Sequence, residues 1–565
     1  MSKTKKIESD PARRRLMQMA RRDRSAMAVA SGLSVLAALL WLPQAWLVSR
    51  FLAALAEGRM PGPGPVATAG AFVALGTLRH LLDLLAGRRA FRIGQRLIDR
   101  ERTDLVERES LTSPLARSGH TSAALATLLA GKLDALLPWA SRYRLAAARV
   151  AVVPAVILVV VASMSWLAGI VLLVAGPPIP VFMALIGLAA RQASEKHMAE
   201  TGTLNSILLE WLNAAADIRL LNAEALTVDR FRRSAEALRV RTMEVLRIAF
   251  LSSTVLELFS AIGIALVAVY VGFALLGILS FGAYVTPLSV SQGIFILLLA
   301  PDFFQPLRDL AAAWHDKAAA LAVAGELAER DRQPAPRILG RGAKAGSLSA
   351  GALTIATRGL RFEAGGREIC FPDIEIMPGE KVAICGPSGV GKTTLVGLLC
   401  GLARPLAGRV EIGGRPLDDD LADAWRAMIG FVGQHPHMLN ASLRANIALA
   451  SQRIDAGRLD AALTAAEADA VMAALPRGPD TRLGENGSGV SGGEARRLTI
   501  ARAIYADARV VFADEPTADL DPATAAKVVK ALESIGRRGA TLVIATHDPR
   551  LVARCDRAIV LDAVQ

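Results

Sequence analysis

Long apolar runs dominate the first 330 residues of the chain, whereas shorter apolar runs alternate with polar segments in the remainder. A helix needs about 20 mostly apolar residues to cross the ~30 Å hydrocarbon core of a bilayer. Six runs in the first part reach this length, and they cover residues 27–55, 66–86, 145–163, 167–190, 248–276 and 286–304. The pattern therefore predicts a membrane bundle of six transmembrane helices within residues 1–329.

Two local features shape the middle of this bundle. The third and fourth runs are nearly continuous and together too long for one span, so the chain must turn tightly at residues 164–166. Proline has no backbone N–H, and its ring crowds the preceding turn of a helix. Pro177, Pro178 and Pro180 therefore predict a kink in the fourth transmembrane helix.

The distribution of Lys and Arg predicts the orientation in the membrane. The segment before the first span and the two long segments 88–144 and 191–247 are rich in basic residues, whereas the three short connections contain only Arg59. Basic residues collect on the cytoplasmic side of membrane proteins. Both termini and the two long segments are therefore expected in the cytoplasm.

The two long segments have the apolar spacing of helices, for example at Leu204, Leu208 and Trp211. We interpret them as membrane helices that continue into the cytoplasm. Their tips, near residues 111–117 and 213–222, are then the expected contacts with a soluble domain. A simple amphipathic stalk is the alternative interpretation.

Composition supports a membrane protein joined to a soluble part. The 565 residues are 53% hydrophobic with a mean hydropathy of +0.38, above the ~45–50% apolar content of soluble domains. A wholly soluble enzyme and a disordered chain are thereby excluded. The net charge of +13 fits basic cytoplasmic loops, so we expect membrane lipid and no nucleic acid as a partner. The four cysteines lack metal-ligand spacing and are expected to be reduced thiols.

We single out four of the ionisable residues that interrupt or border the apolar runs. These are Arg79 and His80 in the second run, Glu257 in the fifth, and His315 after the sixth. A charge at mid-membrane costs roughly 2.5–3.5 kcal/mol on insertion scales, so each is a candidate for contact with a transported substrate. An interhelical ion pair or hydrogen bond is the alternative for each of them.

A stretch rich in Pro, Gly and Arg at residues 330–346 is predicted to be a linker. Across residues 347–565 strand-like runs alternate with helical ones, as in an α/β nucleotide-binding domain. A G-x-x-x-x-G-K-T sequence follows the strand-like run 380–385 and opens a helix. This context is the one that a phosphate-binding loop requires, because backbone N–H groups at the start of a helix cradle phosphates.

The residues expected to bind nucleotide in this loop are consecutive: Gly386, Pro387, Ser388, Gly389, Val390, Gly391, Lys392, Thr393 and Thr394. Lys392 supplies charge to the β and γ phosphates, and the Thr393 hydroxyl is a ligand for Mg²⁺. The apolar run 508–513 ends in two acids. Asp514 is placed to hold Mg²⁺, and Glu515 to orient or deprotonate the attacking water. The pattern predicts hydrolysis of a nucleoside triphosphate with Mg²⁺, and the resemblance described next implies that it is ATP.

Further motifs resemble those of ATP-binding cassette transporters. Residues 490–494 (Val-Ser-Gly-Gly-Glu) resemble the signature loop of that family, and residues 518–521 resemble its D-loop. Gln434 matches the Q-loop position, and His547 matches the switch histidine. The resemblance implies catalysis by Glu515 with assistance from His547 and Gln434, and it also makes Gln434 a Mg²⁺ ligand.

In that family two cassettes pair head to tail. The resemblance therefore implies that one chain completes the nucleotide site of another with Ser491, Gly492, Gly493 and Asp521. Six spans followed by one cassette resemble an exporter half-transporter, so a dimer is implied. The predicted fold is a membrane α-helical bundle of exporter type followed by an α/β P-loop ATP-binding cassette domain.

Three positions depart from the family pattern. Ala364 stands where an aromatic residue usually stacks on adenine, Glu494 replaces a glutamine, and Val490 replaces a leucine. The last two substitutions leave the serine and glycines of the signature loop in place. How adenine is held stays open. A regulatory subunit that binds ATP with little turnover is an alternative, which Glu515 and His547 oppose.

Three stretches outside the cassette motifs, 241–253, 265–273 and 299–310, resemble the CydD family of bacterial exporter subunits. That resemblance implies a CydC-like partner in a heterodimer of the inner membrane. It also implies export of cysteine and glutathione, with links to haem and to assembly of cytochrome bd oxidase.

The substrate is open between a small thiol and haem. Arg79 suits the carboxylates of glutathione, whereas His80 and His315 suit the iron of haem. A homodimeric exporter of lipids or drugs is the alternative function.

Overall fold

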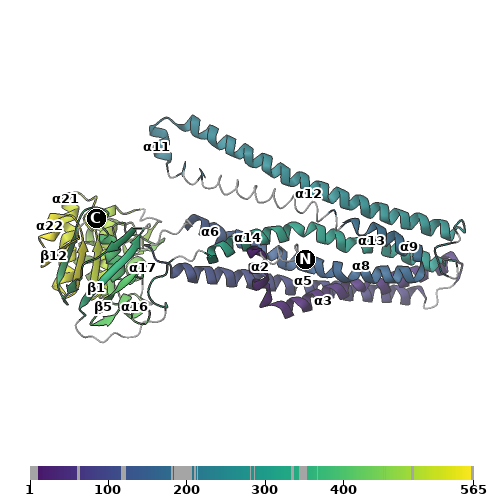
Figure 1. The fold of residues 1–565 in the computed structure, drawn as a ribbon, viewed down its shortest axis with the longest axis horizontal. Helices are drawn as coiled ribbons and strands as arrows, with labels where there is room; N and C mark the ends of the chain where they lie inside the picture. The colour runs from purple at the N-terminus through teal and green to yellow at the C-terminus, as the bar shows by residue number, and fades with distance from the viewer. Residues whose placement is uncertain are drawn as a thin grey trace. The chain divides into compact units, whose positions relative to one another are not determined.

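A computed structural model describes the chain (Figure 1). The described residues are 10–59, 64–115, 122–179, 182, 207–208, 211–212, 214–279, 281–284, 287–332, 336–342, 353–364, 367–449, 451, 453–484 and 489–561. The chain separates into two compact units. The first contains residues 1–105 and 121–333, and the second contains residues 106–120 and 334–565.

The described residues of the first unit form helices (Figure 1). Their bounds are α2 Pro11–Arg21, α3 Arg24–Leu39, α4 Trp41–Ala56, α5 Pro65–Ser110, α6 Ser122–Ala130, α7 Leu136–Pro138, α8 Arg144–Met164, α9 Trp166–Ala175, α11 Ala215–Leu220, α12 Glu224–Leu275, α13 Val290–Ala312 and α14 Trp314–Arg332. A 3₁₀ turn, η1 (Lys132–Ala135), and a π-helical turn, η2 (Trp139–Tyr143), connect α6, α7 and α8.

Five helical segments are long and apolar enough to cross a membrane. They are Arg24–Ala56, Pro65–Ser110, Lys132–Met164, Thr254–Leu275 and Val290–Arg332. These segments contain or overlap the first, second, third, fifth and sixth predicted spans. The fourth predicted span begins with the short apolar helix α9. Most of its remainder, including Pro180, lies outside the described residues.

The tight turn predicted between the third and fourth spans is confirmed. Helix α8 ends at Met164, Ser165 is extended (φ −145°, ψ 113°), and α9 begins at the next residue. The Ser165 hydroxyl accepts a hydrogen bond from the Ala168 backbone N–H (3.2 Å). It also donates to the carbonyl of Gly282 (2.7 Å) and lies 2.9 Å from the Tyr270 hydroxyl. This fully buried serine therefore joins three segments of the unit.

In two places a helix ends close to a proline, which cannot donate a backbone hydrogen bond. Helix α9 ends at Ala175, two residues before Pro177. The first predicted span consists of two consecutive helices, α3 and α4, which meet at Leu40. Pro43 cannot donate a hydrogen bond to the carbonyl of Leu39, which accounts for that break.

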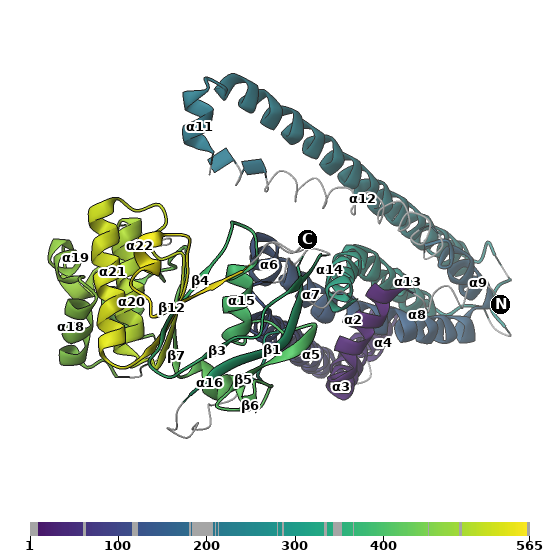
Figure 2. The same ribbon diagram turned by 60° about the vertical axis from the view of Figure 1, so that its left-hand side comes forward.

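Two helices are much longer than a membrane crossing. Helix α5 has 46 residues and α12 has 52, so they extend about 70 Å and 80 Å at 1.5 Å per residue. Figure 2 shows α12 running from α11 at its N-terminal end to the neighbourhood of α9. Both helices are long enough to cross a bilayer and continue beyond it, and their extension into the cytoplasm stays a prediction.

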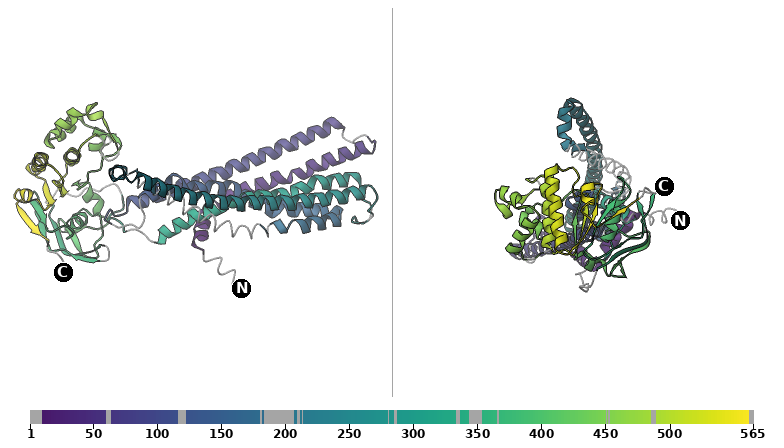
Figure 3. Two further views of the ribbon diagram at one scale, coloured as in Figure 1. Left: turned by 90° about the horizontal axis from the view of Figure 1, so that it is seen from above. Right: turned by 90° about the vertical axis from the view of Figure 1, so that its left-hand side faces the viewer.

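The core of the first unit forms around α13. Helix α13 packs against α4, α8 and α12, and the rings of Phe303 and Phe304 meet edge to face with centroids 4.9 Å apart. The indole N–H of Trp41 donates to the carbonyl of Leu298 (3.3 Å), which connects α4 to α13. In Figure 3 the purple helices α4 and α5 run side by side.

The second unit contains two main sheets. A parallel sheet has the order β12-β4-β11-β10-β7, and an antiparallel sheet has the order β2-β1-β5-β6, with β3 paired to β1. The strands are β1 Ile355–Ala364, β2 Arg367–Cys370, β3 Glu375–Ile376, β4 Lys381–Cys385, β5 Ala407–Ile412, β6 Arg415–Pro416, β7 Ile429–Val432, β8 Ala441–Ser442, β9 Arg482–Leu483, β10 Val510–Asp514, β11 Thr541–Ala545 and β12 Arg557–Val560. Strands β8 and β9 pair separately.

The helices of this unit lie around the parallel sheet (Figures 1 and 2). They are α15 Lys392–Leu399, α16 Ala422–Arg426, α17 Leu443–Ile447, α18 Ala456–Ala465, α19 Asp469–Ala474, α20 Gly492–Tyr505, α21 Pro522–Arg537 and α22 Pro549–Val552, with a 3₁₀ turn η3 at Gly478–Asp480. Every residue of β10 and β11 is buried, as expected for central strands covered on both faces. Phe512 packs in one core with Trp425, whereas Val511 packs in the other with Leu498.

The tip that follows α5 packs within the second unit. The Ser113 hydroxyl donates to the carbonyl of Leu402 (2.5 Å), and the Leu115 side chain packs beside Gly397 in α15. The Ile338 backbone N–H donates to the carbonyl of Leu111 (2.9 Å). The expected contact of this tip with the soluble domain is confirmed for the described residues up to 115. The second tip contains α11, which belongs to the first unit.

Candidate functional site

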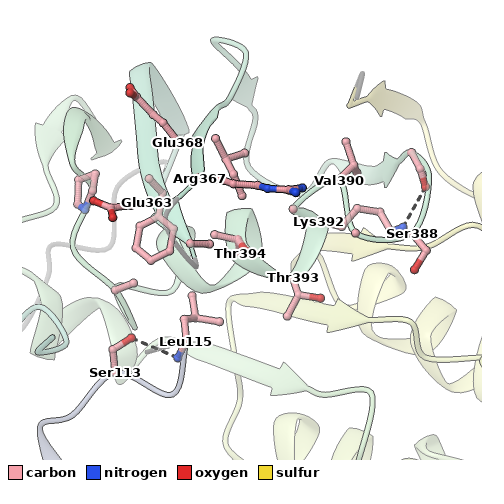
Figure 4. Close-up of a pocket in the computed structure, with 18 of the residues that line it drawn as sticks. Ser113, Leu115, Glu363, Arg367, Glu368, Ser388, Val390, Lys392, Thr393 and Thr394 are labelled. Carbon is pink, nitrogen blue, oxygen red and sulfur yellow. Dashed lines mark hydrogen bonds between the residues drawn. The ribbon is translucent and has the colours of Figure 1, made fainter. Parts of the chain in front are cut away.

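A cavity of about 1860 Å³ opens in the second unit. Figure 4 shows it between the β1–β2 hairpin, the loop that follows β4, and the tip that follows α5. Its lining includes the whole predicted phosphate loop together with Gln434, Glu515 and His547. Strands β4, β10 and β11 are parallel, so the segments that follow them meet at one edge of the sheet. Residues distant in sequence are thus brought to one site.

The loop between β4 and α15 has a backbone that favours glycine. Gly386 and Gly391 have φ values of 150° and 105°, in the left-handed region that other residues rarely adopt. A Cβ atom on Gly386 would lie 2.7 Å from the carbonyl oxygen of Leu561. The loop therefore adopts its tight curve at the N-terminus of α15, where free N–H groups attract phosphate.

Lys392 is held inside this loop. Its ammonium group donates to the carbonyls of Gly386 (2.9 Å) and Pro387 (3.3 Å) and lies 3.5 Å from a carboxylate oxygen of Glu515. The residue is only 8% exposed. A buried cation is thus placed between the phosphate loop and the carboxylate at the end of β10.

Glu515 lies between two partners. One carboxylate oxygen faces Lys392, and the other lies 2.9 Å from Nδ1 of His547. The carboxylate side chain is 12% exposed, whereas the His547 side chain is 71% exposed. Glu515 also has a positive φ of 43°, a costly conformation for a residue with a side chain. Its backbone N–H donates to Ala545 of β11 (2.8 Å), which helps to hold this turn.

Asp514 precedes Glu515 and is 3% exposed. Burial raises the pKa of its carboxyl group and the charge of Glu515 raises it further, whereas the hydroxyl of Thr393 and the charge of Lys392 lower it. Within the described part of the chain, Oδ1 of Asp514 has no hydrogen-bond partner although it is buried. A buried carboxylate oxygen beside a threonine hydroxyl fits the preference of Mg²⁺ for oxygen ligands.

The predicted Q-loop residue Gln434 is anchored by a residue that the sequence analysis missed. The Arg496 guanidinium donates to the carbonyl of Gln434 (2.6 Å) and to those of Pro516 (3.0 Å) and Ala518 (2.7 Å). Burial lowers the pKa of Arg496. Its position in a helix that begins at the signature loop is the only signal for this role in the sequence. Arg496 ties three loops of the site together.

The signature loop and the D-loop both begin helices. Ser491 caps α20, and Glu494 completes a capping box, with Ser491 N–H to Glu494 Oε2 at 2.7 Å and the reverse bond at 3.4 Å. Each side chain therefore accepts a hydrogen bond from the backbone N–H of the other residue, so both N–H groups at the start of α20 have partners. Gly493 is required because a Cβ atom there would collide with Thr524 of α21.

Asp521 caps α21 by accepting hydrogen bonds from the N–H groups of Ala523 and Thr524, both at 3.0 Å. The bond from the Thr524 hydroxyl lowers the pKa of Asp521 most. Asp521 and the signature residues Ser491, Gly492 and Gly493 do not contribute to the cavity lining described above. Within one chain the fold brings together the phosphate-loop half of the predicted site but not the signature half.

The predicted adenine position is also in the cavity. Ala364 lines it at the end of β1, and Phe362, Arg367 and Ile369 of the same hairpin line it as well. The sequence analysis singled out Ala364 as a departure and did not identify Arg367. Leu115, from the tip after α5, is a second lining residue that it did not identify.

The substrate candidates of the first unit are spread over several helices. The Arg79 guanidinium lies over the Trp41 ring, 5.3 Å from its centroid. His80 in α5, Glu257 in α12 and His315 in α14 are exposed. Among the residues that the structure describes, no group of three or more His, Cys, Asp or Glu side chains is arranged to bind a metal ion. Arg79 makes a cation–π contact between α5 and α4, which is neither the substrate contact nor the ion pair or hydrogen bond that the sequence analysis considered. Its contact with a transported substrate stays a prediction.

An ion-pair cluster in the same unit was missed by the sequence analysis. Arg149 of α8 pairs with Asp83 of α5, donates from Nε to the Ser34 hydroxyl (2.6 Å), and lies 3.9 Å from Asp309 of α13. Asp83 and Arg149 lie within the second and third predicted spans, and Asp309 follows the sixth. The sequence analysis did not single out these residues.

Two family models match the chain. The model described as ABC transporter matches residues 372–518, and the model described as ABC transporter transmembrane region matches residues 27–298. The first match contains the phosphate loop, the signature loop and the acids at the end of β10. The second covers most of the predicted spans.

Relatives match along nearly the whole chain. The transport ATP-binding protein AarD of Providencia stuartii is 33% identical over 527 residues, which cover 91% of this chain and 87% of the relative. The glutathione/L-cysteine transport system ATP-binding/permease protein CydD of Escherichia coli is 32% identical with the same coverage. An ATP-dependent lipid A-core flippase of Burkholderia orbicola is 32% identical, and the match covers 71% of this chain and 66% of the flippase.

The fold is that of a known exporter. A bacterial Atm1-family ABC exporter with ATP bound superposes with a TM-score of 0.78. The match covers 96% of this chain and 94% of the exporter, at 22% sequence identity. The helical unit followed by an α/β unit is thus an exporter architecture.

Proposed function

This chain belongs to the ABC transporter family as a half-transporter of the exporter type, with ATP hydrolysis coupled to transport, and from that premise we propose its substrate and partner. The substrate is a small thiol, cysteine or glutathione, which moves out of the cytoplasm. The partner is a CydC-like subunit, and the heterodimer lies in a bacterial inner membrane with both cassettes in the cytoplasm. The observation that carries the proposal is the similarity to the CydD protein over 91% of the chain.

The proposed hydrolytic step uses the contacts around Glu515. Lys392 contacts the carbonyls of its own loop and Glu515, and a phosphate in the loop would attract its ammonium group away from both. The carboxylate of Glu515 is then available to accept a proton from the attacking water. His547, 2.9 Å from the other oxygen, holds the carboxylate in position. Thr393, Asp514 and Gln434 would hold Mg²⁺, which would supply positive charge to neutralise the phosphates.

The partner subunit supplies the missing half of each site. Ser491, Gly492, Gly493 and Asp521 are held rigidly at the starts of α20 and α21, outside the cavity that contains Lys392. A helix N-terminus preceded by glycine offers free N–H groups to phosphate oxygens. We propose that these residues close over the nucleotide of the partner, and that the partner closes over the nucleotide of this chain.

The substrate contacts proposed in the membrane are cationic. Glutathione and cysteine carry carboxylates, which guanidinium groups bind through paired hydrogen bonds. Arg79 is positioned by the Trp41 ring. Glu257, His80 and His315 are exposed. Haem, together with support of cytochrome bd assembly, is a second candidate, because histidine side chains are common ligands of haem iron.

A transport assay tests this proposal. The chain and a CydC-like partner are reconstituted in inside-out vesicles, and ATP-dependent uptake of labelled glutathione and cysteine is measured beside haem and lipid A. We expect uptake of a thiol that is abolished by Glu515→Gln, because that variant lacks the proton acceptor. Uptake of lipid A alone would favour a lipid exporter, a function that the flippase relative supports.

Single variants test the membrane contact. Arg79→Gln is expected to raise the half-saturating concentration of glutathione about tenfold, because one charged hydrogen-bond donor is lost. Arg59→Gln is the matched control, since Arg59 is 78% exposed and pairs only with Glu57 among the described residues. Equal effects of the two variants would refute a role for Arg79. Equal ATPase activity with and without every ligand, in the presence of the partner, would favour the regulatory-subunit alternative.

A further inference from the structure

The β1–β2 hairpin forms one wall of the nucleotide cavity. Phe362 lies directly opposite Ile369, and Ala364 lies directly opposite Arg367. Directly opposed residues of an antiparallel pair, and residues two apart on one strand, project from the same face. Phe362, Ala364, Arg367 and Ile369 therefore share one face of the hairpin, and all four line the cavity.

This face meets the phosphate loop. A Cβ atom on Gly391 would lie 3.4 Å from the Ile369 side chain, so the hairpin approaches the loop closely. Figure 4 shows Arg367 extending from β2 toward the segment that carries Val390 and Lys392. The apolar residues Phe362, Ile369 and Val390 line the same cavity as Arg367.

Arg367 is an exposed residue that lines the cavity. Within the described ranges its guanidinium has no hydrogen-bond or ion-pair partner, whereas the guanidinium of Arg361 on the same hairpin pairs with Glu368 (3.3 Å). Ala364 provides only a methyl group, so the space beside Arg367 on the shared face is left open. A planar guanidinium with one face free stacks well on aromatic rings and nucleobases.

We propose that Arg367 binds the adenine ring of ATP by stacking its guanidinium plane on the base, with Phe362 and Ile369 forming the apolar side of the same subsite. The phosphates lie in the Gly386–Thr394 loop, and the base extends toward the hairpin. Arg367 is thus a residue for nucleotide binding. This inference does not depend on whether a thiol, haem or a lipid crosses the membrane, because it concerns ATP alone.

Equilibrium binding to the full chain in lipid nanodiscs tests the inference. All proteins carry Glu515→Gln to prevent hydrolysis, and binding of Mg-ATP is compared with binding of Mg-tripolyphosphate, which has the phosphates without the base. We expect Arg367→Ala to weaken ATP binding about tenfold and tripolyphosphate binding less than twofold, as expected for loss of one stacking partner. Retained tripolyphosphate binding also shows that the phosphate loop is folded.

Two replacements at the same position separate stacking from charge. Arg367→Tyr keeps a flat surface without a charge, and we expect it to restore ATP affinity to within about threefold. Arg367→Lys keeps the charge without a flat surface, and we expect it to resemble Arg367→Ala. Arg361→Ala is the matched control, because it removes an arginine of the same hairpin that does not line the cavity.

Three results would overturn the inference. The first is unchanged ATP affinity in Arg367→Ala. The second is an equal loss of ATP and tripolyphosphate binding that Arg367→Lys restores, since Arg367 would then be a phosphate ligand. The third is loss of both ligands in Arg367→Ala without recovery of ATP binding in Arg367→Tyr. If Arg367→Tyr does recover ATP binding, stacking is supported.

Discussion

The nucleotide unit and the membrane unit differ in how far one chain assembles its polar chemistry. In the nucleotide unit, Lys392 and His547 lie 3.5 Å and 2.9 Å from the two oxygens of Glu515, and the lysine and glutamate are nearly buried. The segments that carry them follow β4, β10 and β11, whose register is fixed by neighbouring strands. This part of the site is therefore complete before any ligand binds.

In the membrane unit the candidate polar residues are not gathered in this way. Arg79 packs on Trp41, while His80, Glu257 and His315 are exposed on three different helices. Long helices position side chains only along their own faces, so a binding site between helices needs further surfaces to complete it. The comparison shows that one chain gathers the residues of the phosphate-loop half of the nucleotide site, whereas it does not gather the candidate substrate residues of the membrane unit.

The largest expected effect tests whether the preassembled cluster is the hydrolytic centre. Glu515→Gln should lower the ATPase rate of the complex by about 10²–10³-fold, because a general base of this kind contributes about that much. ATP binding should persist, since Lys392 and the phosphate loop are unchanged. Glu533→Gln is the control, because Glu533 pairs with Arg554 on the surface. A rate loss of less than tenfold in Glu515→Gln would show that the cluster around Glu515 is not the hydrolytic centre.

The pH dependence of Mg²⁺ binding tests the role of Asp514 in the nucleotide unit. Burial raises the pKa of Asp514, so more of this carboxyl group is protonated at a given acidic pH than for an ordinary aspartate. Protons then compete with Mg²⁺ for the same oxygen. We expect the Mg²⁺ concentration for half-maximal ATPase activity to rise several-fold as pH falls from 8 to 6. Magnesium titrations at each pH measure this shift, and a pH-independent value would show that Asp514 is not a ligand.

A smaller effect tests the buried hydrogen bonds of Ser165 in the membrane unit. Ser165→Ala removes the hydroxyl that bonds Gly282, Tyr270 and the start of α9, so we expect a loss of about 1–2 kcal/mol in stability. Ser163→Ala is the matched control, because the Ser163 hydroxyl is bonded only to the Val160 carbonyl of its own helix among the described residues. Thermal unfolding in detergent compares the two, and equal melting temperatures would contradict this role.

The smallest effect concerns the signature loop. Glu494→Gln should leave ATPase activity within twofold of the parent, because glutamine also completes a capping box with Ser491. Glu494→Ala should lower stability by about 0.5–1 kcal/mol, because the Ser491 N–H loses its partner. Thermal unfolding and ATPase rates measure both. A large loss in Glu494→Gln would mean that the carboxylate acts in catalysis.

Much of the nucleotide site was predictable from local sequence. The residues from Gly386 to Thr394 are contiguous, and the strand before them and the helix after them are contiguous with them as well. The acids Asp514 and Glu515 directly end a buried strand. The conformation of such segments can be predicted from the sequence because it depends mainly on neighbouring residues.

Residues whose role depends on distant partners were not predictable in this way. Arg496 contacts Gln434, 62 residues away, and Arg367 is significant only because Ala364 lies opposite it across a strand pair. Leu115 enters the cavity from the tip after α5. Nothing in the local spacing of these residues indicates the partner that each one meets.

The sequence by itself determined the class of this protein. Apolar runs long enough for a bilayer and a glycine-rich loop between a strand and a helix follow from hydrophobicity and backbone sterics, which act over a few residues. Only the tertiary structure decided that Lys392 faces Glu515, that Ser165 joins Tyr270 to Gly282, and that Arg367 faces the cavity. These contacts depend on strand order and helix packing, and both are set by burial across the whole unit.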